Sequence, residues 1–190
     1  MLGLLTPTDG RWIEAALSNL DSVLLDHLHC ELKAASNATA LIGRYPGHPR
    51  LVRELSALAQ EELSHVVQVH AELERRGLTA HPPDPDAYAA ALRRAAGEQQ
   101  ADPLLDRLTV AALIEARSCE RFGILKEHAP TPELRAWYGE LFASEARHHR
   151  VFASLAEDVA GFEIARARLV QLVAREAVIV AGLPIVARIH

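Results

Sequence analysis

The chain has 190 residues, of which 49% are hydrophobic and 24% are charged, so its composition is that of a globular protein near the size of one domain. A net charge of −5 argues against a general nucleic-acid binder, and two widely separated cysteines exclude a zinc ribbon or a disulfide framework. The sequence shows neither a secretory signal nor an apolar run of membrane-spanning length. We therefore predict a single domain over residues 1–190, in a soluble, cytoplasmic protein.

Long stretches rich in Ala, Leu, Glu and Arg, without alternation of apolar and polar residues, predict an all-α fold. The apolar stripe of the first long helix runs from 17 to 42, and turn-forming residues at 43–49 separate it from a second stripe over 51–73. A longer connection between Gly77 and Pro103 contains a short helical pattern from Asp86 to about Ala96.

Two further stripes, over 104–125 and 134–159, meet at a second turn over 129–132. After Gly161, the segment from 162 to about 181 has enough apolar residues to pack as an additional helix. These elements predict a four-helix bundle with a long crossover connection and an extra C-terminal helix.

Each of the four stripes carries a glutamate near its middle, and the second and fourth also carry a histidine three residues further on. Burying ionised carboxylates costs several kcal/mol each unless a counter-charge compensates them, so four glutamates facing one core need an explanation. Two divalent metal ions would provide that explanation. Residues three apart on a helix are neighbours, so the Glu and His of each E-x-x-H motif can reach one ion. One Glu from each of two helices and an E-x-x-H motif from each of the other two is the set typical of di-iron bundles. The predicted ligands are Glu31, Glu62, His65, Glu115, Glu145 and His148.

The register of these residues strengthens a motif that is weak by itself. In an antiparallel hairpin, residues at the same height are equidistant from the turn. The first two glutamates are equidistant from Pro46–Gly47, and the last two are equidistant from Pro130, so both midpoints fall in the predicted turns. The halves also repeat, with 84 residues between the first and third glutamates and 83 between the second and fourth. Mixed carboxylate and imidazole donors favour iron, with manganese as the second choice. The alternative is that the glutamates are solvated residues on helices whose phase has been misjudged.

Several neighbours of the predicted ligands have other expected roles. His27, four residues before Glu31, is expected either to hydrogen-bond that ligand or to be a buried core histidine. Glu120 is expected either to contact a metal ligand without binding the metal itself or to act as an additional ligand. Glu61 and His149 adjoin ligands but point away from the stripes, so both are expected to face solvent.

Four runs, at residues 26–36, 61–65, 114–122 and 144–148, carry a family resemblance. The most specific is Ile-Glu-Ala-Arg-Ser-Cys-Glu-Arg-Phe at 114–122, and the likeness extends from about Leu5 to about Val159. The chain resembles the tRNA-(2-methylthio-isopentenyl-adenosine) hydroxylases, the MiaE family. This resemblance implies a ferritin-like di-iron fold whose ligands are the six residues named above. It also implies oxygen-dependent hydroxylation of the isopentenyl group of a modified adenosine in tRNA, with two iron ions as cofactor, molecular oxygen as co-substrate and an external, ferredoxin- or reductase-like electron donor.

Binding of tRNA would require a local basic patch. Arg75, Arg76, Arg93 and Arg94 flank the long connection and are the predicted contacts, the alternative being ordinary solvated helix ends. We expect a monomer or small homo-oligomer with no membrane partner. The competing functions are those of other ferritin-like di-metal proteins, namely iron storage, manganese catalase or peroxide reduction, and that of a helical interaction module without metal.

Overall fold

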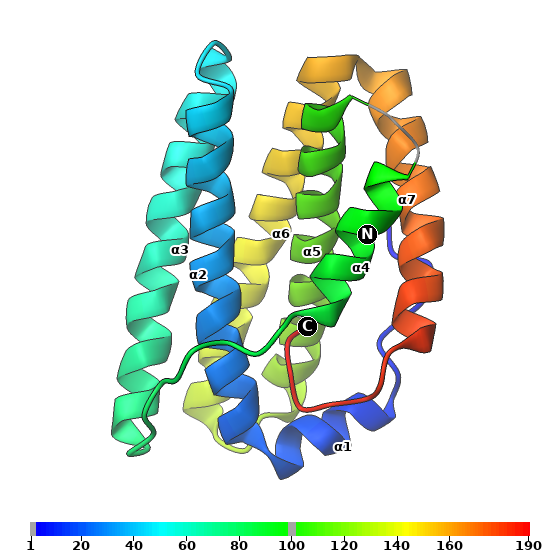
Figure 1. The fold of residues 1–190 in the computed structure, drawn as a ribbon. Helices are drawn as coiled ribbons and strands as arrows, with labels where there is room; N and C mark the ends of the chain where they lie inside the picture. Colours follow the sequence, from blue (N-terminus) through cyan, green and yellow to red (C-terminus); the bar gives the residue numbers. More distant parts are fainter. Residues whose placement is uncertain (1–2, 99–101) are drawn as a thin grey trace. The chain divides into compact units, whose positions relative to one another are not determined.

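The computed structural model describes residues 3–98 and 102–190, and all regular structure in these two stretches is helical (Figure 1). The predicted all-α class is therefore confirmed. No helix in the described stretches is long and apolar enough to cross a membrane. The helices are α1 (Arg11–Ser18), α2 (Leu20–Arg44), α3 (Pro49–Arg75), α4 (Ala87–Gly97), α5 (Pro103–His128), α6 (Pro132–Ala160) and α7 (Phe162–Gly182).

The chain divides into two compact units. The α2–α3 unit comprises Ser18–Pro85 with Ala187–Ile189, and the α5–α6 unit comprises Met1–Leu17, Asp86–Val186 and His190. The single domain expected over residues 1–190 stays a prediction.

In the α2–α3 unit, α2 and α3 lie side by side as a hairpin (Figure 1). The side chain of Asn19 accepts a hydrogen bond from Ser22 N at 3.2 Å and so caps the start of α2, while Pro49 occupies the first turn of α3. The turn between the helices falls at the predicted place. Every position of the predicted α3 stripe is buried: Leu51, Leu55, Leu58, Glu62, His65, Val69 and Leu73.

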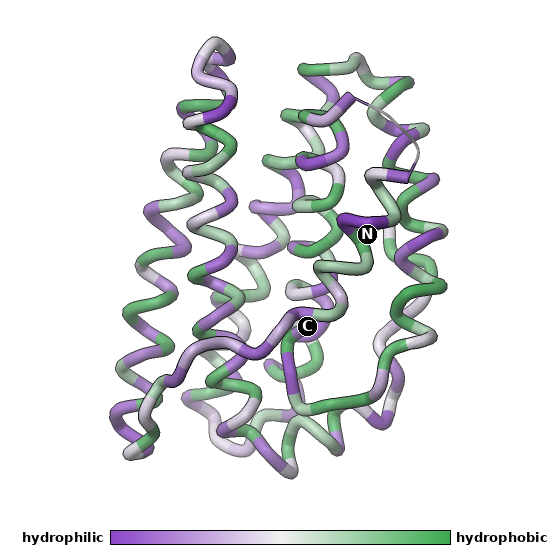
Figure 2. The backbone as a smooth tube through the Cα atoms, in the orientation of Figure 1, coloured by the Kyte–Doolittle hydropathy of each residue, from purple (hydrophilic) through white to green (hydrophobic). Residues whose placement is uncertain are grey.

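In the α5–α6 unit, α5 and α6 form a second hairpin, and α4 and α7 pack against α5. The side chain of Asp102 caps α5, and that of Thr131 caps α6 by accepting a hydrogen bond from Leu134 N at 3.3 Å. Hydrophobic and hydrophilic stretches alternate along each of these helices (Figure 2), as expected when one face is buried. The apolar cluster among α4, α5 and α7 contains Tyr88, Leu92, Ala96, Val110, Leu113, Leu172 and Val173.

A single residue, Gly161, separates α6 from α7, and its backbone has φ 82° and ψ 153°. Only glycine adopts this conformation readily, so Gly161 lets one helix end and the next begin without a loop.

The beginning of the first long helix was predicted wrongly. Leu17 continues the spacing of the α2 stripe, yet it belongs to a separate helix, α1, and its side chain is 39% exposed. The chain breaks at Asn19 because asparagine caps a helix better than it continues one. Helix α1 is held instead by Trp12, which is buried with Arg121 over its ring at 5.0 Å.

Candidate metal centre

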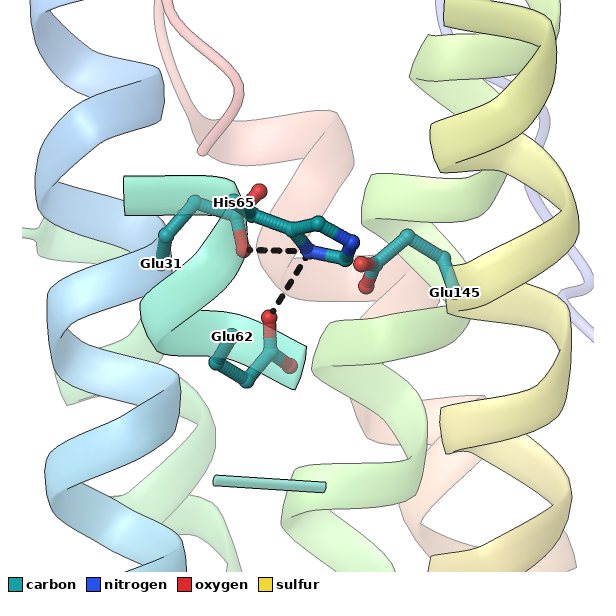
Figure 3. Close-up of side chains that lie close together, drawn as sticks. All are labelled: Glu31, Glu62, His65 and Glu145. Atoms are coloured by element: carbon teal, nitrogen blue, oxygen red, sulfur yellow. Dashed lines mark hydrogen bonds and ion pairs between the residues drawn. The ribbon is translucent and has the colours of Figure 1, made fainter. Parts of the chain in front are cut away.

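The α2–α3 hairpin brings together three of the predicted ligands, Glu31 on α2 and Glu62 and His65 on α3 (Figure 3). His65 Nδ1 lies 3.4 Å from Glu31 Oε2 and 3.3 Å from Glu62 Oε2. All three side chains are buried, and each offers one ligand atom within 4.8 Å of the other two. We call these three residues the α2–α3 donor set.

The electrostatics of this set favour a positive charge at its centre. Burial acts to lower the pKa of His65, but hydrogen bonds and charge from Glu31 and Glu62 outweigh it and raise this pKa to about 10. Burial acts to raise the pKa of Glu31, yet hydrogen bonds from His27 and His65 hold that pKa below its usual range. His27 is fully buried, with Nε2 2.7 Å from Glu31 Oε1, so it fixes the orientation of this carboxylate.

The α5–α6 hairpin carries the other three predicted ligands, Glu115 on α5 and Glu145 and His148 on α6. These side chains are also buried and offer ligand atoms within 4.8 Å of one another. His148 Nδ1 lies 3.6 Å from Glu145 Oε1, and Ser144 Oγ lies 3.4 Å from His148 Nε2. We call Glu115, Glu145 and His148 the α5–α6 donor set.

The chemistry of both sets fits a metal ion. Glu145 Oε1 is buried and has no hydrogen-bond partner among the described residues, which is costly for a carboxylate unless a cation contacts it. Each set supplies two carboxylates and one imidazole, a combination that suits iron or manganese. The buried glutamates and histidines can therefore bind metal.

Glu120, expected beside the site, holds the N-terminal segment. Its carboxylate accepts hydrogen bonds from Thr8 N at 3.1 Å and Thr8 Oγ1 at 2.6 Å, and it pairs with Arg117. Glu61 and His149 are half-buried, so each is only partly open to solvent, where fully solvent-facing positions had been expected. His149 Nδ1 donates a hydrogen bond to the Ala112 carbonyl at 2.8 Å, because a residue beside the stripe lies at the seam between paired helices.

The predicted tRNA-contacting arginines differ in their surroundings. Arg75 and Arg76 each bind Glu72 at 2.7 Å, which holds the pKa of that carboxyl below its usual range. Arg93 and Arg94 are exposed on α4 and form no salt bridge with residues that the structure describes.

One buried polar cluster was not predicted from the sequence. Arg117 and Glu176 form an ion pair at 2.7 Å between α5 and α7, and Tyr88 donates a hydrogen bond to Glu176. The signal that could have indicated it was a charged residue at a stripe position of the C-terminal helix, where Glu176 follows Leu172 and Val173.

Comparison with known proteins gives the family. The family described as "tRNA-(MS[2]IO[6]A)-hydroxylase (MiaE)" matches residues 2–190. This chain belongs to the MiaE family. The match includes α7, for which the sequence had indicated no relationship.

Two MiaE relatives bear the name "tRNA 2-(methylsulfanyl)-N(6)-isopentenyladenosine(37) hydroxylase". The protein from Pseudomonas putida is 45% identical over 167 residues, which cover 88% of this chain and 80% of the relative. The protein from Salmonella typhimurium is 29% identical over 209 aligned positions, covering 83% of this chain and 76% of the relative. These relatives confirm the predicted family and, with it, that the chain is an enzyme.

A solved structure shares the fold. It is that of "Protein 43 with aldehyde deformylating oxygenase activity from Synechococcus", and it matches with a TM-score of 0.91 and 40% identity over 98% of this chain and 94% of that one. The predicted ferritin-like fold is thereby confirmed.

Proposed function

We propose that this chain hydroxylates the isopentenyl group of 2-methylthio-isopentenyl-adenosine in tRNA, using molecular oxygen and two iron ions. The observation that carries the proposal is the MiaE match over residues 2–190 of a chain that has the same buried donor set twice. The reaction takes place on tRNA, so we place the enzyme in the cytoplasm.

The two donor sets are proposed to act as one dinuclear centre. Together they contribute four carboxylates, whose four negative charges match two divalent cations. The repeat of nearly equal length between the two hairpins supports this pairing, because such a centre takes one Glu from each of two helices and an E-x-x-H motif from each of the other two. The proposed ligands are Glu31, Glu62, His65, Glu115, Glu145 and His148.

Two iron ions, when bound, supply the reduction of O2 that allows a C–H bond to be oxidised. The overall reaction converts C–H, O2, two electrons and two protons into C–OH and water, so an external electron donor is required, which we propose to be ferredoxin- or reductase-like. The protein's own contribution is to fix its ligands and exclude water. His27 performs the first task for Glu31, and burial of all six ligands performs the second.

We infer that tRNA phosphates contact Arg93 and Arg94 rather than Arg75 and Arg76, because Glu72 and Asp21 already form ion pairs with the second two arginines. Replacing Arg93 and Arg94 by Ala is expected to raise KM for tRNA. The plot of the logarithm of the tRNA association constant against the logarithm of salt concentration should also become less steep, by about 0.7 to 0.9 in slope for each lost contact. Turnover of the free nucleoside, which has no phosphate, should not change. If this double variant binds tRNA normally, the contacts lie elsewhere, with Arg75 and Arg76 as the next pair to test.

The decisive experiment supplies iron-loaded protein, a chemical reductant and isotope-labelled O2 to tRNA that carries the prenylated nucleoside. Mass spectrometry of the digested nucleosides should show one labelled oxygen atom in the isopentenyl group. Because the related Synechococcus protein is named for an aldehyde deformylating activity, an aldehyde is the second substrate to supply. Turnover of the aldehyde with unaltered tRNA would refute the proposal.

The other ferritin-like functions predict different results in simple assays. Iron storage requires a closed multisubunit shell, which size-exclusion chromatography would detect. A manganese catalase would contain manganese and release O2 from peroxide, and a helical interaction module would bind no metal.

A further inference from the structure

Arg117 lies at the centre of a buried polar cluster in the α5–α6 unit. Its side chain is 1% exposed. Nε and Nη2 donate to Glu176 Oε1 at 3.0 and 2.7 Å, and Nη2 also donates to the Thr6 carbonyl at 2.9 Å. Nη1 donates to Thr8 Oγ1 at 3.2 Å and to Glu120. One guanidinium on α5 is thus held by α7 on one side and by the N-terminal segment on the other.

Glu176 receives its hydrogen bonds unevenly. Tyr88 Oη donates to Oε1 at 3.1 Å, the same oxygen that accepts both bonds from Arg117. The other oxygen, Oε2, is buried without a hydrogen-bond partner among the described residues. A buried ion pair contributes to stability only when its remaining polar atoms are satisfied, so this arrangement is poorly built for stability alone.

The location of the cluster gives it a second role. Arg117 follows the proposed ligand Glu115 by two residues, which is about 3 Å along the helix axis. Because the guanidinium is fixed from two sides, rotation of α5 about its axis, which would swing Glu115 away from Glu145 and His148, would also break the bonds of Arg117.

We propose that Arg117 and Glu176 are positioning residues that fix the rotation of α5 and hold Glu115 in the α5–α6 donor set. Helix α7 is then part of the metal-binding apparatus although it supplies no ligand. This inference rests on the proposed metal centre.

The same two helices provide a matched control. Arg168 on α7 is 4% exposed and donates to Asp106 Oδ1 of α5 at 2.7 Å and to the Ala96 carbonyl at 2.8 Å. Asp106 lies nine residues before Glu115, about 14 Å along the axis. Loss of this pair should weaken the contact between α5 and α7 without releasing the ligand.

The test compares Arg117→Met, Arg168→Met and a triple variant, Tyr88→Phe with Arg117→Met and Glu176→Leu, which replaces the buried charges by apolar groups. Each full-length protein is melted with chelator and titrated anaerobically with Co²⁺, whose visible spectrum reports both affinity and coordination. Both single variants should melt about 6 to 20 °C below wild type. Of these two single variants, only Arg117→Met should bind Co²⁺ more weakly than wild type, by about 10- to 100-fold, and with an altered spectrum.

The triple variant separates positioning from stability. It should recover most of the melting temperature while its Co²⁺ affinity stays low. Recovery of affinity together with stability, or equal weakening in Arg168→Met, would overturn the inference. Wild-type protein that binds no Co²⁺ would overturn the proposed function as well, whereas wild-type binding that is unchanged in Arg117→Met would overturn the positioning role alone.

Discussion

Glu145 offers the sharpest test of the metal centre, because one of its carboxylate oxygens has no hydrogen-bond partner among the described residues. The side chain is 2% exposed, and the nearest imidazole nitrogen in its donor set, His148 Nδ1, is 3.6 Å from Oε1. Replacing Glu145 by Gln removes the charge and keeps the shape. Without metal the variant should be more stable than wild type. Addition of metal should raise its melting temperature by less than it raises that of wild type.

The magnitudes follow from burial and mass action. A buried charge without a partner costs more than a buried amide without one, and a difference of about 1 to 3 kcal/mol should raise the melting temperature in chelator by about 2 to 12 °C. Metal at 100 times its Kd stabilises the wild type by about 2.7 kcal/mol, or about 5 to 11 °C. If loss of the ligand weakens binding a hundredfold, the variant gains only about 0.4 kcal/mol, or about 1 to 2 °C.

The assay is a thermal melt in chelator and again with Co²⁺ under anaerobic conditions. Glu140→Gln is the control, because it makes the same chemical change at an exposed position of α6 and should shift either melt by no more than about 2 °C. A Glu145→Gln variant that melts below wild type in chelator, or that keeps the full metal-induced shift, would refute the reasoning.

Three further predictions concern the scaffold. Asn19→Ala should lose about 1 kcal/mol with the cap of α2, seen as a melt about 2 to 4 °C lower; an unchanged melt would mean that Asn19 is not a cap. Gly161→Ala should cost about 1 to 3 kcal/mol in urea unfolding, from local backbone strain at its positive φ, because no described atom beyond its own residue and its two chain neighbours lies within 4 Å of the added Cβ. Burial, and then the charge of Glu176, raise the pKa of Tyr88 well above its usual value, so its contribution to stability is present below about pH 10 and is lost above it. Stability of Tyr88→Phe should therefore fall less steeply than that of wild type between pH 10 and 11, and equal slopes would contradict this.

The hairpins and the burial of their Glu and His residues were predictable because the information is local. Leucines at steps of three and four define the α3 stripe, and every residue of it is buried, including Glu62 and His65. The turn between α2 and α3 follows from its proline and glycine residues. Equidistance from that turn then placed Glu31 against the E-x-x-H pair, where the structure has it.

Other features depend on contacts that the local pattern does not encode. The break at Asn19 was missed because Leu17 continues the apolar spacing into α1. Arg117 stood in the most specific family run, but its partner Glu176 lies 59 residues away on α7. A charge at a stripe position indicates that a partner exists, and only the fold identifies it.

The buried acids of this chain differ in the kind of cation that faces them, and the difference agrees with their proposed roles. Glu176 is paired with Arg117, which never gives up its proton, so that carboxylate is neutralised permanently. Glu31 and Glu145 face imidazoles in their donor sets, His65 in the first case. An imidazole neutralises a carboxylate when protonated and becomes a metal ligand when it releases the proton, so the same residues can exchange a proton for a metal ion. With the proposed roles, arginine thus stands where a charge stays neutralised, and histidine stands where the neutralising cation is to be exchanged for a metal ion.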